Sequence, residues 1–340
     1  MELRSSRIVG VELDTGVLRA VEIKGESGKP FVVGAGRVQV PEEAIIDGVV
    51  NDAAAVGKAL QSLWQEARFG SRRVVPGIFN RSVLIRMITF PRLPGEKIKK
   101  ALRLQAGAHL PIPVSQTVLD FAVVGEAYAD NELLNEVLLV AARREQLMAC
   151  LQAFWHGRLT PVVVDASPLA LPRLLPPAKR QGIVVMVDLA LGLSSIVIAV
   201  NGMPRFARML PVSLKQCLKD LEVAAGGDRR HDKFVAAAVE KSTGEDMYVR
   251  HWCKIVAREI KISLGYYVRH DRFKKVDRLV LSGLGARVHG LATLLQDELQ
   301  LPAEVAVPQA AAGVQGKPGV DLSQPEFAVS LALALRGLEV

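Results

Sequence analysis

Acidic residues close two strand-like runs that lie far apart in this 340-residue chain. The first run ends near Glu12, before the turn Asp14-Thr15-Gly16, and the second ends on Asp188, before a turn that contains Gly192. Two carboxylates that face each other can hold a hydrated Mg²⁺, and the N–H groups of such turns can receive phosphates. The paired turns therefore predict a metal and phosphate site, with Glu12 and Asp188 as the metal ligands.

A glycine-bearing loop late in the chain adds a third part to this prediction. Gly283 and Gly285 follow a buried strand, and glycine lets a ligand such as adenosine approach the backbone closely. The hydroxyls of Ser194 and Ser195 follow the second turn and are further candidates for phosphate binding. The plain alternative stays open: the acids only cap turns, and the glycines only let a helix over 291–299 pack on its strand.

The elements that would position these residues form two similar hairpins. Strands are expected over 8–13 and 17–23, and again over 183–188 and 194–200. Recurrence of one plan predicts two lobes of similar topology, which suits the length of the chain. Half of the residues are hydrophobic and only 5% are aromatic, so we expect an α/β fold.

Between the two hairpins, residues 81–162 read as a self-contained α+β insert. Strands are expected over 83–90, 118–124 and 136–142, with helices over 96–108 and 144–156. Seven basic residues and one acid lie between Arg81 and Gln105. A solvated helix face explains such a run, and a docking surface explains it equally well. The docking interpretation selects four residues, Arg86, Lys99, Lys100 and Arg103.

Several classes of function find no support in the sequence. The net charge of +8 favours an acidic partner, yet no recognition helix or zinc finger accompanies the basic run, so no nucleic acid is expected. The three cysteines lack metal or disulfide spacing and are expected to be reduced. No signal segment or membrane-spanning stretch is read. No hydrolase triad or His cluster is recognisable, so no catalytic residue is predicted.

Several short segments together resemble one protein family. They are Val9-Gly10-Val11-Glu12, Ile45-Ile46-Asp47-Gly48-Val49-Val50-Asn51-Asp52, Leu102-Arg103-Leu104-Gln105-Ala106, Leu110-Pro111-Ile112-Pro113, Glu259-Ile260-Lys261-Ile262-Ser263-Leu264, Leu281-Ser282-Gly283 and Pro325-Glu326-Phe327-Ala328-Val329. In them the chain resembles the PilM proteins of type IV pilus assembly, relatives of FtsA in the actin/Hsp70-like superfamily.

The resemblance implies an actin/Hsp70-like α/β fold of two lobes with an inserted α+β subdomain. The expected parts are 1–80 for the first lobe, 81–162 for the insert, 163–182 for the return and linker, 183–213 and 276–322 for the second lobe, 214–275 for a helical subdomain, and 323–340 for a helix on the first lobe.

The resemblance also implies a site for ATP and Mg²⁺ between the lobes, with at most weak hydrolysis. Carried over by position, the cofactor-binding residues are Glu12, Asp14, Thr15, Gly16, Asp188, Gly192, Ser194, Ser195, Glu259, Ser263, Gly283 and Gly285. The chain departs from the family pattern at Asp14, where the family has glycine, and at Leu284, which interrupts a glycine run. A carboxylate beside a phosphate repels it, so we expect weakened or lost ATP binding.

The implied function is that of a cytoplasmic scaffold at the inner face of the inner membrane. It would grip the N-terminal cytoplasmic peptide of a PilN-like bitopic membrane protein in a groove between the first lobe and the insert. Other pilus or secretion platform proteins and a homo-oligomer are further expected partners. Two alternatives remain, an ATP-binding switch with slow ATPase activity and a stand-alone secretion domain of the GspL type.

Overall fold

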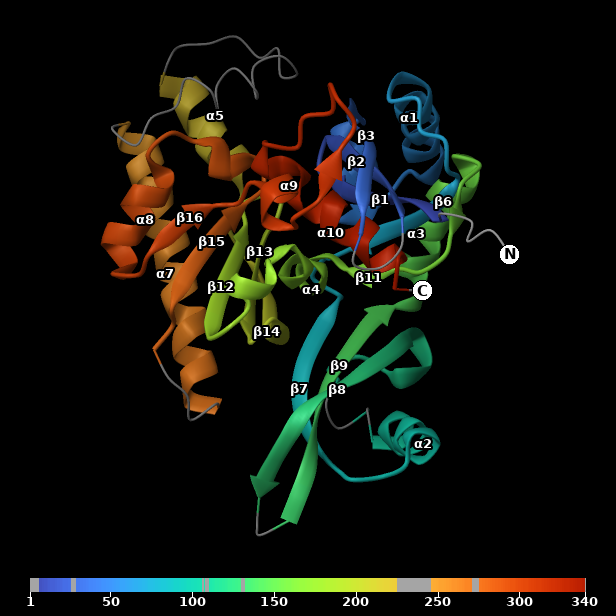
Figure 1. Ribbon diagram of the computed structural model, residues 1–340, viewed down its shortest axis with the longest axis vertical. Helices are drawn as coiled ribbons and strands as arrows, with labels where there is room; N and C mark the ends of the chain where they lie inside the picture. The colour runs from blue at the N-terminus through green and yellow to red at the C-terminus, as the bar shows by residue number, and fades with distance from the viewer. Residues whose placement is uncertain are drawn as a thin grey trace.

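Three β-sheets organise the chain, as Figure 1 shows for the computed structural model. The structure describes residues 6–25, 29–105, 107, 110–129, 132–224, 246–270 and 275–339. Two larger sheets lie side by side in the upper part of the view, and the third sheet extends below them. We call the first sheet and its helices the first lobe, the second sheet and its helices the second lobe, and the third sheet with its helix the insert.

The first lobe is built on a seven-stranded sheet that begins with a hairpin. Its path is β10-β6-β1-β2-β3-β17, and β11 also pairs with β6. The strands are β1 (Ser6–Asp14), β2 (Val17–Gly25), β3 (Phe31–Gln39), β6 (Arg73–Ile78), β10 (Thr160–Pro161), β11 (Asp165–Ala166) and β17 (Gln315–Gly316). Since β1 and β2 are antiparallel, Glu12 stands opposite Arg19 and Asp14 opposite Val17.

Helices cover both faces of this sheet. On one face α1 (Ala53–Glu66) and α3 (Arg144–His156) pack together over a buried apolar core. The side chain of Asp52 caps α1 by accepting the N–H groups of Ala54 and Ala55. On the other face α10 (Ala328–Gly337) crosses β1, β2 and β6.

Helix α10 lies within a core that both lobes share. The buried side chains around it come from the first sheet, such as Val21, and from the second, such as Met186. It approaches β1 so closely that a Cβ added to Gly10 would lie 2.1 Å from the carbonyl oxygen of Ser330. Burial on nearly every face explains the apolar sequence of this helix.

The second lobe contains a five-stranded sheet that also begins with a hairpin. Its order is β14-β13-β12-β15-β16. The strands are β12 (Ile183–Asp188), β13 (Ser194–Val200), β14 (Met203–Leu210), β15 (Arg278–Ser282) and β16 (Ala303–Val305). Its helices α5 (Leu214–Ala224), α7 (Met247–His270) and α8 (Leu291–Leu299) contribute buried side chains to one large core with this sheet.

The insert is a three-stranded sheet of order β7-β9-β8 with one helix. The elements are β7 (Leu84–Pro91), α2 (Gly95–Gln105), β8 (Thr117–Ala129) and β9 (Glu132–Arg143). Helix α2 packs on the sheet through a small core of Phe90, Ile98, Leu102 and Val137. A two-stranded ribbon, β4 (Ile45–Ile46) with β5 (Val49–Val50), lies in the first lobe.

Short helical segments complete the described elements. They are α4 (Ser167–Ala170), α9 (Pro308–Ala311), η1 (Glu42–Ala44), η3 (Val114–Gln116), η4 (Leu171–Leu174), η5 (Pro177–Lys179), η6 (Leu284–Arg287) and η7 (Pro325–Phe327).

Both predicted hairpins are present, whereas β8 and β9 extend beyond the strands predicted over 118–124 and 136–142. Residues 160–166 form two short strands, β10 and β11, because pairing with β6 is interrupted between Pro161 and Asp165. Helix α1 ends before Arg68, whose φ of 54° is incompatible with a continuing right-handed helix. Strand β14 was not predicted; it pairs with β13 in antiparallel register. Part of the helical subdomain expected over 214–275 lies outside the described residues.

Candidate functional site

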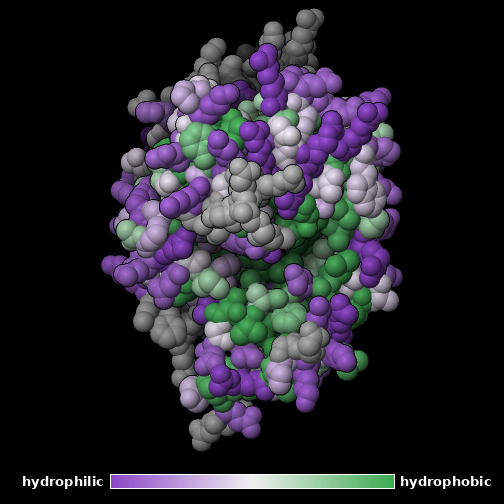
Figure 2. Space-filling view, turned by 45° about the vertical axis from the view of Figure 1, so that its right-hand side comes forward, coloured by the Kyte–Doolittle hydropathy of each residue, from purple (hydrophilic) through white to green (hydrophobic). Residues whose placement is uncertain are grey.

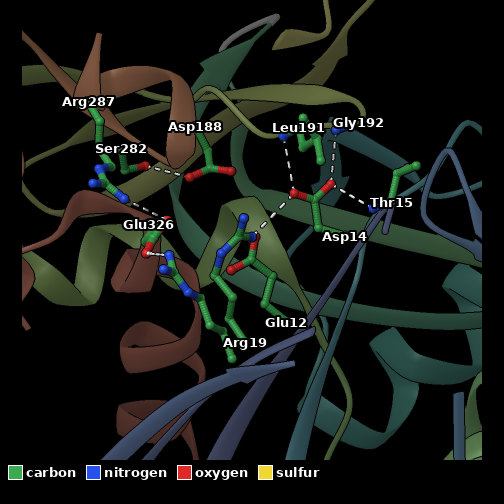
Figure 3. Close-up of polar contacts among 11 residues, drawn as sticks. Glu12, Asp14, Thr15, Arg19, Asp188, Leu191, Gly192, Ser282, Arg287 and Glu326 are labelled. Atoms are coloured by element: carbon green, nitrogen blue, oxygen red, sulfur yellow. Dashed lines mark hydrogen bonds and ion pairs between the residues drawn. The ribbon is translucent and has the colours of Figure 1, made fainter. Parts of the chain in front are cut away.

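The first turn places a buried arginine between two buried acids. Glu12 and Asp14 are two residues apart on β1, so their side chains share one face of the sheet. Nη1 of Arg19 donates to Oε1 of Glu12 at 3.3 Å and to Oδ2 of Asp14 at 3.2 Å (Figure 3). The Arg19 side chain is only 2% exposed. Sequence reasoning missed Arg19, although its place opposite Glu12 in a hairpin could have revealed it.

Asp14 also reaches across to the second turn, residues 189–193. Its Oδ2 accepts the backbone N–H of Leu191 at 3.1 Å, and its Oδ1 accepts that of Gly192 at 3.0 Å. The N–H of Thr15 donates to the same Oδ1 at 2.8 Å. The two turns predicted to face a ligand are therefore bonded to each other.

Asp188 lies at the same junction, held by its neighbour in the sheet. Strands β12 and β15 are parallel, and Asp188 pairs in register with Ser282, whose Oγ donates to Oδ1 of Asp188 at 2.7 Å. Figure 3 shows Asp188 above Glu12 and Arg19, between the hairpins of the two lobes. The structure thus brings Glu12, Asp14 and Asp188 to one junction between the lobes, where each acid affects the electrostatics of the others.

Burial dominates the electrostatics of these acids. It raises the pKa of Asp188 to about 6, with Asp14 adding to the rise, while the hydrogen bond from Ser282 and the charge of Arg19 oppose it. Burial also raises the pKa of Glu12 well above its ordinary value; Arg19 opposes this, and Asp188 and Asp14 add to it. Oε2 of Glu12 is buried without a hydrogen-bond partner among the described residues. These acids therefore favour their neutral forms more than exposed acids do.

A fourth buried acid, Glu326, extends the cluster and was also missed. Nη1 of Arg37 donates to its Oε1 at 2.7 Å, and the guanidinium of Arg287 lies 3.6 Å from its Oε2. Glu326 belongs to η7, directly after Pro325, whose carbonyl accepts the N–H of Gly283. An acid at the start of an otherwise apolar helix is the sequence signal that could have found it.

The predicted adenosine loop packs against the second turn. Gly283 has a φ of +82°, and a Cβ there would lie 2.6 Å from the carbonyl oxygen of Leu189. The N–H of Gly285 donates to that same oxygen at 2.8 Å, and its Cβ would lie 2.9 Å from the ring of Trp252. Both glycines therefore serve close packing within the second lobe, the plain alternative considered above, whether or not a ligand also approaches.

The other predicted cofactor residues fall into two groups. Ser194 and Ser195 are buried at the start of β13, where Ser195 pairs with Asp188. Glu259 and Ser263 lie on α7, and both engage Arg208: its Nη2 donates to Oε2 of Glu259 at 3.0 Å and its Nε to Oγ of Ser263 at 2.9 Å. These last two side chains thus serve a contact between α7 and β14.

Gly16 has a structural role in the first turn. Its φ is +76°, a conformation that favours glycine, and a Cβ there would lie 3.5 Å from Cγ of Glu42. The tight turn places the N–H of Val40 against the carbonyl of Gly16 at 3.1 Å.

The residues at this junction do not fit ATP with Mg²⁺ as they stand. The N–H groups that would receive a phosphate already donate to Asp14, and Arg19 already supplies a cation to Glu12 and Asp14. Across the described ranges, no group of three or more His, Cys, Asp or Glu side chains is arranged to hold a metal ion. Of the two predicted Mg²⁺ ligands, Glu12 is instead paired with Arg19, and Asp188 accepts the hydroxyl of Ser282.

A groove lies where the first lobe meets the insert. It has a volume of about 520 Å³, and its lining comes from the β4–β5 ribbon, the start of β7 and the loop before η3. The lining residues are Ile46, Asp47, Val49, Asn51, Asn80, Arg81, Ser82, Leu84, Pro111, Ile112, Arg143 and Gln146. Figure 2 shows hydrophobic residues gathered around a hollow between the larger upper part and the smaller lower part of the molecule.

The four predicted docking residues lie elsewhere on the insert. Lys99, Lys100 and Arg103 are exposed on α2. Arg86 is exposed on β7 and lines a second cavity of about 120 Å³, which the aromatic rings of Phe206 and others on the second lobe also line. None of the four lines the groove, whose basic residues are Arg81 and Arg143.

Each of the two larger sheets begins with a hairpin, and helix α10 lies in the core that they share. The acids of the first and second turns meet between these sheets. This arrangement defines a protein of the actin-like ATPase fold. A sequence model of the family described as type IV pilus assembly protein PilM matches residues 10–338. The chain belongs to this family, and both the predicted family and the predicted fold are confirmed.

Solved structures agree with this assignment. The chain is similar to a chain of the PilM-PilN type IV pilus biogenesis complex, with 28% identity, 98% of this chain and 99% of that chain covered, and a TM-score of 0.83. It is also similar to ethanolamine utilization protein EutJ from Carboxydothermus hydrogenoformans, with 14% identity, coverages of 98% and 91%, and a TM-score of 0.60.

A nucleotide-bound structure shares the fold as well. MreB 5 of Spiroplasma citri bound to AMPPNP is 10% identical, with coverages of 98% and 95% and a TM-score of 0.50. At these identities EutJ and MreB 5 show the fold alone. In the described part of the chain, every helix is too short or too polar to cross a membrane.

Proposed function

We propose that this protein is a scaffold of a type IV pilus or related type II secretion platform that grips an extended peptide in the groove between the first lobe and the insert. The observation that carries the proposal is the groove itself, which apolar side chains from three segments and two arginines line. The similar solved structure is a complex of PilM with PilN, which supports a PilN-like partner.

The chemistry of the groove suits an extended peptide with apolar and acidic residues. Ile46, Leu84 and Ile112 offer apolar surface to alternate side chains of a strand-like segment. The guanidinium groups of Arg81 and Arg143 can pair with carboxylates, in bidentate geometry where the peptide allows it. We therefore propose the N-terminal cytoplasmic peptide of a PilN-like bitopic membrane protein as the occupant.

We further propose that ATP binding is weakened or lost and that the protein is at most a weak ATPase. The contact of Asp14 with the second turn supports this, because a phosphate would have to displace a carboxylate. The competing proposal is a switch that ATP closes, which the fold of a nucleotide-bound relative favours. Calorimetry with Mg·ATP decides between them: tight binding that Asp188→Ala weakens would favour the switch.

The proposed position is cytoplasmic, at the inner face of the inner membrane, reached through the membrane partner. Other platform proteins and further copies of this chain are proposed contacts of the same assembly. Fractionation of cells with and without the partner gene tests the position: the protein should leave the membrane fraction when the partner is absent.

Peptide binding measured by fluorescence anisotropy tests the groove. Ile112→Asp and Arg81→Glu should each weaken binding of the partner's N-terminal peptide by about tenfold or more, the loss of one central contact. Leu104→Asp is the matched control, because Leu104 is 86% exposed on the insert and does not line the groove. Equal binding by Ile112→Asp and Leu104→Asp would contradict the groove.

The four docking residues predicted from the basic run have a separate test. Reversing the charge of Arg86, Lys99, Lys100 and Arg103 together asks whether this patch attracts the peptide or its membrane. Unchanged peptide binding at low salt would remove these residues from the proposal and leave the groove as the only contact.

A further inference from the structure

The carboxylate of Asp14 sits in a set of donors that suits an anion. Four groups donate to it: the backbone N–H groups of Thr15, Leu191 and Gly192 and the guanidinium of Arg19, at 2.8 to 3.2 Å. Converging backbone N–H groups with an arginine are the donors that proteins use for phosphate groups. Here the anion that these groups bind is a side chain of the protein itself, the carboxylate of Asp14.

The second turn is packed against protein atoms on both sides. A Cβ on Gly192 would lie 2.5 Å from Oγ1 of Thr15 and 3.1 Å from Oδ1 of Asp14, so the two lobes touch here. On the far side, Gly283 packs against the backbone of Leu189. The N–H groups of this turn thus face Asp14 from a short distance.

We infer that Asp14 is a built-in ligand of the second turn, a carboxylate that occupies a phosphate-type anion site and holds the lobes closed without nucleotide. This inference deepens the proposal of weakened ATP binding, on which it rests, and is independent of the peptide groove. Removal of the carboxylate should uncover a site for a phosphate-bearing anion.

A second contact across the lobes fits a closed resting state. The Nζ of Lys215 on α5 donates to the carboxylate of Glu42 in η1. This pair joins the same two lobes but involves no backbone N–H of the second turn. It therefore supplies a control that weakens the lobe contact without exposing an anion site.

Calorimetry with inorganic pyrophosphate, and separately with Mg·AMPPNP, tests the anion site. Asp14→Gly removes the carboxylate, and Asp14→Asn keeps the side-chain volume while removing the charge. We expect both variants to bind these probes about tenfold or more tightly than the wild type, because one negative charge no longer opposes the ligand. Glu42→Gln should bind them as the wild type does.

Pulsed EPR distances test whether the contact closes the lobes. Spin labels at Lys58→Cys on α1 and Thr293→Cys on α8 report the separation of the lobes, since both positions are exposed and the three native cysteines are buried. The wild-type distance should stay the same when Mg·AMPPNP is added. In Asp14→Gly the distribution should broaden, and Mg·AMPPNP should narrow it again.

Several results would overturn the inference. Wild-type affinity equal to that of both Asp14 variants would show that the carboxylate does not occupy an anion site. A wild-type distance that shifts with Mg·AMPPNP, or an unchanged distribution in Asp14→Gly, would show that Asp14 does not hold the lobes. If Asp14→Gly fails to fold, the anion affinity of Asp14→Asn and the spin-label distances of the wild type still test the inference. Partner-peptide binding by the same variants shows separately whether the groove proposal stands.

Discussion

Asp14 and Gly192 are bonded across the two lobes although they are 178 positions apart in the chain. The Oδ1 atom of Asp14 accepts the backbone N–H of Gly192 at 3.0 Å, and the neighbouring N–H of Leu191 donates to Oδ2. A side chain of the first turn is thus bonded directly to the backbone of the second turn.

Replacing the buried arginine should destabilise the protein strongly. Arg19→Met leaves Glu12 and Asp14 buried without their cation, so the free energy of unfolding should fall by about 3 to 5 kcal/mol. Urea unfolding measures it. Arg92→Met is the matched control: both members of its pair with Glu126 are exposed, at 57% and 48%, so a loss below about 1 kcal/mol is expected. Equal losses in the two variants would refute the prediction.

Part of the stability lost in Arg19→Met should return when Glu12 is neutralised as well. The double variant Arg19→Met/Glu12→Gln removes one unpaired buried charge, so it should be more stable than Arg19→Met alone. A double variant less stable than the single one would mean that Arg19 acts through packing rather than charge.

Asp188 should make stability depend on pH in a defined direction. Burial raises its pKa from 3.8 to about 6 in the folded protein, so between these values the folded chain holds more protons than the unfolded chain. Its contribution to the free energy of unfolding is therefore full below pH 3.8 and is lost as pH rises through about 6. The loss is about 3 kcal/mol for a shift of this size.

Asp188→Asn isolates that contribution, because Asn keeps an oxygen for the hydroxyl of Ser282 but cannot titrate. The stability of the variant relative to the wild type should rise by about 2 kcal/mol from pH 4 to pH 7. Urea unfolding at several pH values measures this difference. A difference that is constant with pH would show that Asp188 titrates as an exposed acid does.

The two hairpins could be predicted from the sequence because residues close together in the chain determine each turn. Gly16, with its positive φ, marks the first turn, and the acids at the strand ends follow from the repeated plan. Arg19 was missed because a basic residue in a strand is unremarkable until its partner across the hairpin is considered. The bond from Leu191 to Asp14 could not be predicted at all, since no periodicity relates residues 177 positions apart.

The groove beside the insert also could not be predicted from the sequence. A dense basic run drew attention to α2, whereas the groove takes its arginines, Arg81 and Arg143, from the two ends of the insert. Only the folding of the chain brings those ends together beside the β4–β5 ribbon. Charge density along the sequence therefore located a basic segment but not the concave surface.

Glu259 should act on stability rather than on nucleotide. Its carboxylate pairs with Arg208 of β14, so Glu259→Gln should lower the free energy of unfolding by about 1 to 3 kcal/mol and leave Mg·ATP titrations as in the wild type. Glu304→Gln is the control, since its pair with Lys179 is largely exposed and should matter by less than about 1 kcal/mol. An altered Mg·ATP affinity at unchanged stability would instead support the cofactor role predicted from sequence.

Gly192 should tolerate no side chain, because the lobes meet at its Cα. In Gly192→Ala the new Cβ would lie 2.5 Å from Oγ1 of Thr15, although the backbone at Gly192 does not have a positive φ. Overpacking of this kind costs about 1 to 3 kcal/mol, measurable by urea unfolding. Gly265→Ala in α7 is the matched control: its Cβ meets nothing within 4 Å, so stability should stay or rise by up to about 1 kcal/mol.

The second-site variant Gly192→Ala/Thr15→Ala distinguishes a clash between the lobes from a local effect on the turn. Removal of Oγ1 takes away the nearest atom but leaves Cβ of Thr15 at 3.1 Å, so part of the lost stability should return. If the two losses simply add, the side chain at position 192 disturbs its own turn, and the contact between the lobes is looser than the structure shows.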